Sequence, residues 1–149
     1  MKIVKTNAGA LTNLEVLDLL NSRGASNDTR RFIAPIAKSE YKVYDYLMET
    51  AASTQTREGV NEFAEKCKDF KVAKAEILNI INLRPSTDAN LNSIIERNPD
   101  PDTRDDVNNL KSRGINLNGI LKLVEDLLPP LPATDQENDQ EETENGEES

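Results

Sequence analysis

A single proline interrupts the most hydrophobic stretch of the chain, "KAEILNIINLRPSTDANLNSIIE" at residues 74–96. Proline lacks a backbone N–H and disfavours the helical conformation in the residue before it, so a helix through this stretch must end near Leu83. The side chain of Ser86 or Thr87 can then accept a hydrogen bond from a free backbone N–H at the start of a second helix. The negative charge of Asp88 interacts favourably with the dipole of that helix. We therefore expect two helices joined by a fixed structural corner, made of Arg84, Pro85 and Thr87.

Apolar residues recur at helical spacing along the rest of the chain, which predicts an all-α fold. "TNLE" at 12–15 has the form of a capping box in front of the first helix. Ser39 and Thr56 are expected to cap the next two helices, and a last helix is expected over 118–128, before "PPLP". Because apolar residues surround most of the helix at 74–83, we expect that helix to be the most buried.

The N-terminal residues offer more apolar surface than one packed face of a helix uses. "KIV" at 2–4 is expected to form a short strand. In the helix after Thr12, five apolar side chains cover about 220° of the circumference at about 100° per residue. This pattern fits either a short, fully buried helix or a helix shared between its own core and another subunit. The five residues are Leu14, Val16, Leu17, Leu19 and Leu20.

The formal net charge of −9 belongs almost entirely to the C-terminal segment. Residues 133–149 carry eight acidic and no basic residues, which leaves 18 basic against 19 acidic residues in 1–132. So polar a segment cannot bury enough apolar surface to offset the entropy of ordering. We therefore expect one helical domain at 1–132 and a disordered acidic tail at 133–149, which is either a solvated tail or a contact for a basic partner.

The chain lacks the residues on which most catalytic and cofactor motifs depend. It has no histidine, no cysteine pair and no glycine-rich phosphate-binding motif. Cys67, the one cysteine, falls on the same helical face as Val60 and Phe63, and no histidine could activate it, so a structural role is expected. We expect no catalytic residue, no cofactor and no metal, and an interaction module instead of an enzyme.

The N-terminus has no signal-peptide pattern, and a lone cysteine cannot form an internal disulfide, so we expect a reducing compartment. No apolar run approaches the ~20 residues needed to span a bilayer, and no membrane partner is expected. A helix-turn-helix for DNA is disfavoured as well. The second helix of the corner, within 87–96, has no Lys or Arg, and phosphate attraction supplies much of DNA affinity.

Three stretches together resemble a known family: "NAGALTNLEVLDLL" at 7–20, "SEYKVYDYL" at 39–47 and "KAEILNIINLRPST" at 74–87. They are similar to the small stalk subunit of eukaryotic RNA polymerase III, a family also called calcitonin gene-related peptide receptor component protein. The resemblance covers residues 1–96, then the final helix ending in "LLP" and the acidic tail. Between Ile95 and Ile120 the chain departs from the family pattern, because a longer segment with prolines intervenes.

The resemblance implies an HRDC-like helical bundle in the nucleus that is not catalytic and supports transcription initiation of small RNA genes such as tRNA. It implies a heterodimer with a larger stalk subunit that carries an RNA-binding OB domain. The polymerase core and initiation factors would be further partners, and nucleic acid would be contacted only indirectly. It also implies that the last helix packs against Leu91 and Ile94. The N-terminal end packs against the larger subunit in this family, so the expected partner-binding residues are Ile3, Val4, Leu14 and Leu17.

Two other functions are compatible with the same sequence. The family's other proposed role, a cytoplasmic adaptor in calcitonin gene-related peptide receptor signalling, would use the same fold. An independent HRDC-like nucleic-acid-binding module is the third, and the near-neutral charge of residues 1–132 argues against it. The joint pattern of the three stretches favours the polymerase subunit.

Overall fold

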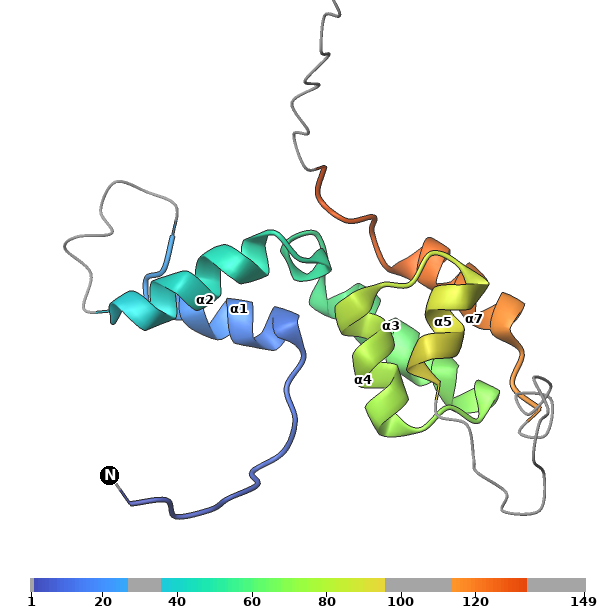
Figure 1. Ribbon diagram of the computed structural model, residues 1–149, viewed down its shortest axis with the longest axis horizontal. Helices are drawn as coiled ribbons and strands as arrows, with labels where there is room; N and C mark the ends of the chain where they lie inside the picture. The colour runs from blue at the N-terminus through green and yellow to red at the C-terminus, as the bar shows by residue number, and fades with distance from the viewer. Residues whose placement is uncertain (1, 27–35, 96–113, 134–149) are drawn as a thin grey trace, which may run out of the picture.

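The computed structural model describes residues 2–26, 36–95 and 114–133, and these contain helices and no strand, which confirms the all-α class (Figure 1). The expected disorder of the acidic tail concerns residues 134–149, outside the described ranges. The helices are α1 (Asn13–Ser22), α2 (Lys38–Met48), the short 3-10 helix η2 (Ala51–Ser53), α3 (Arg57–Cys67), the 3-10 helix η3 (Lys68–Phe70), α4 (Lys74–Leu83), α5 (Asp88–Ile94) and α7 (Leu117–Leu127).

Threonine side chains determine where three of the helices begin. The N–H of Glu15 donates to Thr12 Oγ1 at 3.2 Å, and the N–H of Thr12 donates to the Glu15 carboxylate at 2.7 Å. This is the predicted capping box, which satisfies two amides that would otherwise lack a partner. The Oγ1 atoms of Thr56 and Thr87 each accept a hydrogen bond from the backbone N–H three residues further on, at 3.2 Å.

The helix α2 begins before Ser39, so the prediction of Ser39 as its N-cap is wrong. The N-cap is Ala37, whose N–H donates to Glu40 Oε2 at 3.0 Å. Alanine has no side-chain acceptor, so only the glutamate half of a capping box operates here. The glutamate hydrogen bond therefore sets the start of this helix, and the serine lies inside its first turn.

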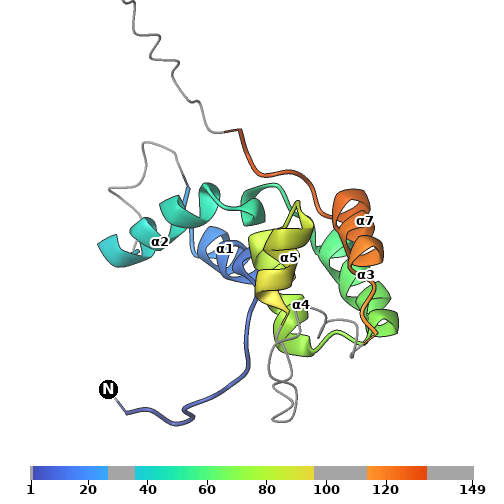
Figure 2. The same cartoon turned by 45° about the vertical axis from the view of Figure 1, so that its right-hand side comes forward.

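The strand expected at residues 2–4 is absent, because residues 2–11 have no regular secondary structure. A β-strand needs a neighbouring strand to satisfy its backbone groups, and the described parts of the chain offer none. Ile3 and Val4 are instead 73% and 93% exposed. Figures 1 and 2 show this segment leaving the start of α1 and running away from the helices.

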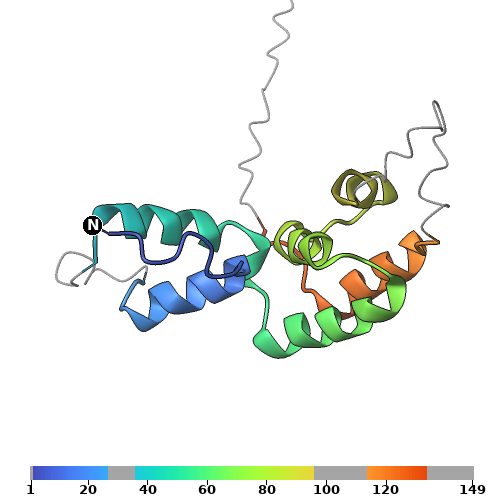
Figure 3. The same ribbon diagram turned by 90° about the horizontal axis from the view of Figure 1, so that it is seen from below.

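The helices form two groups, which Figure 3 shows side by side. In the N-terminal helix pair, α1 packs on α2 and η2 contacts both. In the C-terminal cluster, α3 packs on α7, α7 packs on α5, and α4 contacts both α3 and α5. The last helix thus lies against α5, as the resemblance implies.

Hydrogen bonds fix the N-terminal helix pair against α4. Gln55 precedes α3, and its Nε2 donates to the carbonyl oxygen of Ile81 at 2.7 Å in a buried position. The N–H of Asn13 donates to Asn82 Oδ1 at 2.9 Å. Because η2 also contacts α4, the two groups meet along the C-terminal half of that helix.

The tightest packing lies in the C-terminal cluster, where two glycines allow close approach to their neighbours. A Cβ on Gly59 would lie 2.8 Å from the carbonyl oxygen of Leu127, and one on Gly119 would lie 2.6 Å from the Phe70 ring. These separations are too short for a side chain, so glycine permits this approach. The largest fully buried side chains are Phe63, Cys67, Ile80, Leu91, Ile120, Val124 and Leu128.

The helix α4 has three buried residues, the same number as α1 and α3, so it does not stand out as the most buried helix, contrary to the prediction. Ile80 and Ile81 lie in the core, whereas Leu83 is 63% exposed. Glu76, a charged residue, is buried and accepts the N–H of Ala73 at 2.8 Å. The helix contacts α3, α5 and η2, and Asn82 accepts a hydrogen bond from α1, yet the side of Leu83 stays exposed, so an apolar circumference does not ensure that every side is covered.

Candidate partner-binding surfaces

Large apolar side chains remain exposed in two regions of the described chain. The first region comprises the segment before α1 and the outer sides of α1 and α2. The second is the corner between α4 and α5, together with the segment after α7. Ile3, Val4, Leu11, Leu19, Val43 and Tyr46 belong to the first, and Leu83 and Leu131 belong to the second.

The four residues predicted to bind the partner divide into an exposed pair and a buried pair. Ile3 and Val4 are exposed in the N-terminal segment, while Leu14 and Leu17 are 6% and 4% exposed and lie in the hydrophobic core. The structure therefore does not bring the four side chains together on one surface. A partner can reach the exposed pair without any change in the core.

The outer side of α1 presents an apolar residue that the prediction did not include. Leu19 is 52% exposed and lies about 160° around the helix from Leu17, at about 100° per residue. Leu11, just before the cap, is 54% exposed. The wide apolar arc in the sequence is thus divided between a core face and an outer face, and that arc was the signal for Leu19.

A pocket of about 180 Å³ lies between α1 and α3, beside the point where the N-terminal segment joins α1. Its apolar lining comes from Leu14, Val60 and Ile81, and its polar lining includes Glu15 and Arg57. The pocket is large enough for one apolar side chain.

Arg84 occupies a backbone conformation that is uncommon for a residue with a side chain. Its φ and ψ are 45° and 68°, in the left-handed region, and its N–H donates to the carbonyl oxygen of Ile80 at 2.8 Å. The side-chain Nε donates to the carbonyl oxygens of Pro129 at 2.8 Å and Leu128 at 3.3 Å. One arginine therefore both ends α4 and attaches the corner to the end of α7.

The other two corner residues have structural positions. Pro85 is buried directly after Arg84, and Thr87 caps α5. No pattern in the sequence indicated the hydrogen bonds from Arg84 to carbonyl groups 44 and 45 residues away. Such contacts depend on how distant helices pack, which local spacing does not encode.

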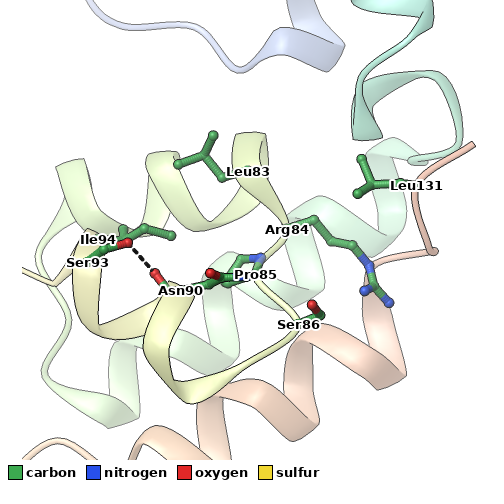
Figure 4. Close-up of a pocket in the computed structure, with 8 residues that line it drawn as sticks. All are labelled: Leu83, Arg84, Pro85, Ser86, Asn90, Ser93, Ile94 and Leu131. Carbon is green, nitrogen blue, oxygen red and sulfur yellow. Dashed lines mark hydrogen bonds between the residues drawn. The ribbon is translucent and has the colours of Figure 1, made fainter.

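A groove of about 280 Å³ opens beside this corner, and Figure 4 shows the side chains around it. Leu83, Ser93 and Ile94 lie toward one end, and Arg84, Ser86 and Leu131 lie toward the other. Apolar side chains thus occur at both ends of the groove, and the positive charge of Arg84 lies at one of them. Its full lining is Leu83, Arg84, Pro85, Ser86, Asn90, Ser93, Ile94 and Leu131.

Cys67 lies in the core of the C-terminal cluster, as predicted. Burial raises the pKa of the Cys67 thiol to about 11, so the nucleophilic thiolate is scarce at neutral pH. Within residues 2–26, 36–95 and 114–133, no group of three or more His, Cys, Asp or Glu side chains could hold a metal ion. No helix in those ranges is both long enough and apolar enough to cross a membrane.

Comparison with known proteins places this helical architecture among transcription proteins. The sequence model of the family described as RNA polymerase Rpb4 matches residues 10–128, from just before the α1 cap to the residue after α7. A protein of Dictyostelium discoideum named DNA-directed RNA polymerase III subunit rpc9 is 32% identical over 105 residues. The aligned part covers 64% of this chain and 76% of that protein.

Proposed function

The chain belongs to the RNA polymerase Rpb4 family, and we propose that it is the small stalk subunit of RNA polymerase III, with no catalytic activity of its own. The observation that carries this proposal is the family match over the helical domain, joined by a relative that is named as a subunit of this polymerase. Neither the receptor-signalling adaptor nor the independent nucleic-acid module has comparable support. A nuclear location and a role in transcription initiation follow from the assignment.

The proposed partner is the larger stalk subunit, and the proposed contact is the exposed N-terminal segment. Ile3 and Val4 are the most exposed large apolar residues of the described chain, and their backbone has no strand beside it. Pairing with a sheet edge of a partner would satisfy that backbone, and alternate side chains would enter the partner surface. The segment "KIV" would then become the strand that its composition favours.

Leu14 and Leu17 would support this interface indirectly. They are buried beneath the first turns of α1, from which the N-terminal segment emerges, and they hold that helix in the core. Ile3, Val4 and Leu11 would make direct contact, and the pocket between α1 and α3 would receive one apolar side chain of the partner. The predicted set of four thus becomes two contacting residues and two positioning residues.

Val4→Asp tests this interface. A buried apolar side chain is worth roughly 1.5–3 kcal/mol, so a charge at this position should weaken association with the larger subunit by about tenfold or more. The thermal midpoint of the isolated chain should stay unchanged, because Val4 is 93% exposed. Titration of the labelled larger subunit, followed by size exclusion, measures both the affinity and the co-elution.

Asn7→Asp is the matched control, since it adds the same charge to the same segment without an apolar loss. Its aspartate can still accept the N–H of Gly9, as Asn7 Oδ1 does at 3.1 Å. Equal affinity of Val4→Asp and Asn7→Asp for the larger subunit would exclude the N-terminal segment as the interface. Affinity purification of the full chain from nuclear extract tests the function itself, because failure to recover RNA polymerase III subunits would contradict it.

A further inference from the structure

The groove beside the corner lies in the C-terminal cluster, away from the proposed interface of the N-terminal segment. Leu83 and Leu131, the two large apolar residues exposed in this region, both line the groove. They come from the end of α4 and from the segment after α7, which Arg84 holds together through its hydrogen bonds to Leu128 and Pro129. The hydrogen bonds of Arg84 therefore hold the two walls of the groove in place.

The Arg84 guanidinium has unused hydrogen-bonding capacity in the described part of the molecule. Its Nε donates to the two backbone carbonyls, but its two terminal nitrogens have no partner among the described residues. No described carboxylate lies within salt-bridge distance of it. The terminal nitrogens of a guanidinium fit the two oxygens of a carboxylate, in a pairing stronger than that of neutral groups.

Two further polar groups in the groove lack partners among the described residues. These are the Ser86 hydroxyl and the Asn90 side-chain amide, whereas the Ser93 hydroxyl already donates to the Asn90 carbonyl oxygen at 2.6 Å. A hydroxyl and an amide are suitable partners for the backbone of an extended peptide. The groove thus combines apolar walls, backbone-binding groups and a cation.

We propose that this groove binds an extended segment of another polymerase chain, in which an apolar side chain lies close to an Asp or Glu. The carboxylate would pair with the terminal nitrogens of Arg84, and the apolar side chain would lie between Leu83 and Ile94. A volume of about 280 Å³ suits one or two side chains. The inference rests on the proposed function in one respect, namely that the segment belongs to the polymerase.

The acidic tail of the chain itself fits the groove less well. Residues 134–149 could supply carboxylates to Arg84, and they follow closely after Leu131. However, they include no apolar residue, so they would leave the apolar side chains of Leu83, Ile94 and Leu131 uncovered. Because the groove presents both a cation and apolar side chains, it should bind a segment with an acidic and an apolar residue better than a purely acidic one.

The left-handed conformation of Arg84 is consistent with this role. Glycine would adopt it without strain, and a residue with a side chain pays about 1 kcal/mol or more to do so. The conformation directs the arginine side chain toward the end of α7, where Nε is anchored and the outer edge of the guanidinium is available. The anchor would reduce the entropy lost when a carboxylate binds.

Site-specific photocrosslinking within the assembled polymerase tests the proposal. Benzoylphenylalanine is placed at Leu83, Leu131 or Val4 of the full chain, and crosslinked peptides are identified by mass spectrometry. We expect Leu83 and Leu131 to crosslink to the same peptide of another polymerase chain, with an apolar residue within a few positions of an acid. Arg84→Gln should lower both yields by about tenfold, while Val4 still crosslinks to the larger stalk subunit.

A variant and a control separate binding from folding. Leu83→Asp changes an exposed side chain and leaves the Arg84 hydrogen bonds intact, and it should abolish the crosslink from Leu131. Benzoylphenylalanine at Glu125, an exposed position on α7, gives the background yield. Absence of any Val4 crosslink and of the chain from the purified polymerase would contradict the proposed function.

With the Val4 crosslink present, several results would overturn the groove proposal alone. These are crosslinks from Leu83 and Leu131 at the Glu125 background, crosslinks to residues 134–149 or to a second copy of the chain, and crosslinks to a peptide without an acid. Retention of the Leu131 crosslink in Leu83→Asp would overturn it as well.

Discussion

The N-terminal helix pair and the C-terminal cluster differ in how completely they bury their apolar side chains. All seven of the largest fully buried side chains of the described chain lie between Phe63 and Leu128, in the cluster. Six of the eight exposed large apolar residues lie in the first 46 residues, in or before the helix pair. Both regions contribute to one hydrophobic core, but the cluster supplies its most fully buried part and the helix pair leaves more apolar surface exposed.

This difference follows from the number of neighbours that each helix has. In the cluster, α7 approaches α3 closely at Gly59 and η3 closely at Gly119, and α5 packs on α7. In the pair, α1 packs on α2 and η2, and Leu19 on its outer side is exposed. An apolar face without a neighbouring helix is a common mark of a protein interface, so the proposed partner would complete the weaker region.

The largest expected effect concerns substitutions of buried residues in the two regions. Phe63→Ala should lower the free energy of unfolding by about 3–5 kcal/mol, because the ring is fully buried and the close-packed cluster cannot collapse around the cavity. Leu20→Ala in the helix pair should cost about 2 kcal/mol, since Leu20 is slightly more exposed than Phe63 and loses a smaller side chain. Urea denaturation followed by circular dichroism measures both values. Equal costs would remove the distinction between the two regions.

The next effect concerns the close approach of α3 and α7. Gly59→Ala should cost about 1–3 kcal/mol, because the new Cβ would lie 2.8 Å from a backbone carbonyl oxygen that cannot move alone. At an exposed helix position the same change raises the free energy of unfolding by about 0.5–1 kcal/mol. The sign of the measured change therefore shows whether Gly59 is in close contact with α7. Asn61→Ala, at an exposed position of α3, is the control and should be neutral or slightly stabilising. A stabilising Gly59→Ala would contradict the tight contact of these helices.

Local signals in the sequence were sufficient for the helical class and for several helix boundaries. The Thr12 capping box, the Thr56 cap and the end of α4 at Leu83 each depend on a few adjacent residues, and they were predicted correctly. The start of α2 was missed because Glu40 competes with Ser39 as a capping group. The strand at residues 2–4 was wrong because strand formation needs a partner that lies elsewhere in space.

The candidate sites depend on long-range packing, and less of them was predictable. An apolar arc in α1 indicated surplus surface, but it could not show that Leu17 faces inward and Leu19 outward. The apolar circumference of α4 suggested full burial, yet Leu83 is exposed because no helix of the described ranges covers that side. The hydrogen bonds of Arg84 join residues far apart in sequence, so the groove beside it had no local signal.

A smaller expected effect is that of Pro85, which can stabilise the corner through packing of its ring or by restricting the unfolded chain. Pro85→Ala should lower the free energy of unfolding by about 1 kcal/mol, mainly because the unfolded chain gains conformational freedom. Hydrogen exchange should increase in α4 and α5 and stay unchanged in α1 and α2, since the corner belongs to the cluster. A loss of several kcal/mol would mean that the buried proline ring contributes chiefly through packing.

The smallest expected effect is that of the acidic tail, on which we expect neither region to depend. A chain truncated after Ala133 should keep its helical circular dichroism, and its free energy of unfolding should change by less than about 0.5 kcal/mol. The reason is compositional, because residues 134–149 contain no apolar side chain that could extend either core, and their eight acids repel one another. Increased hydrogen exchange confined to the corner after truncation would instead mean that tail carboxylates pair with Arg84. If truncation leaves hydrogen exchange unchanged in both regions, the difference in burial between them is a property of the helices alone.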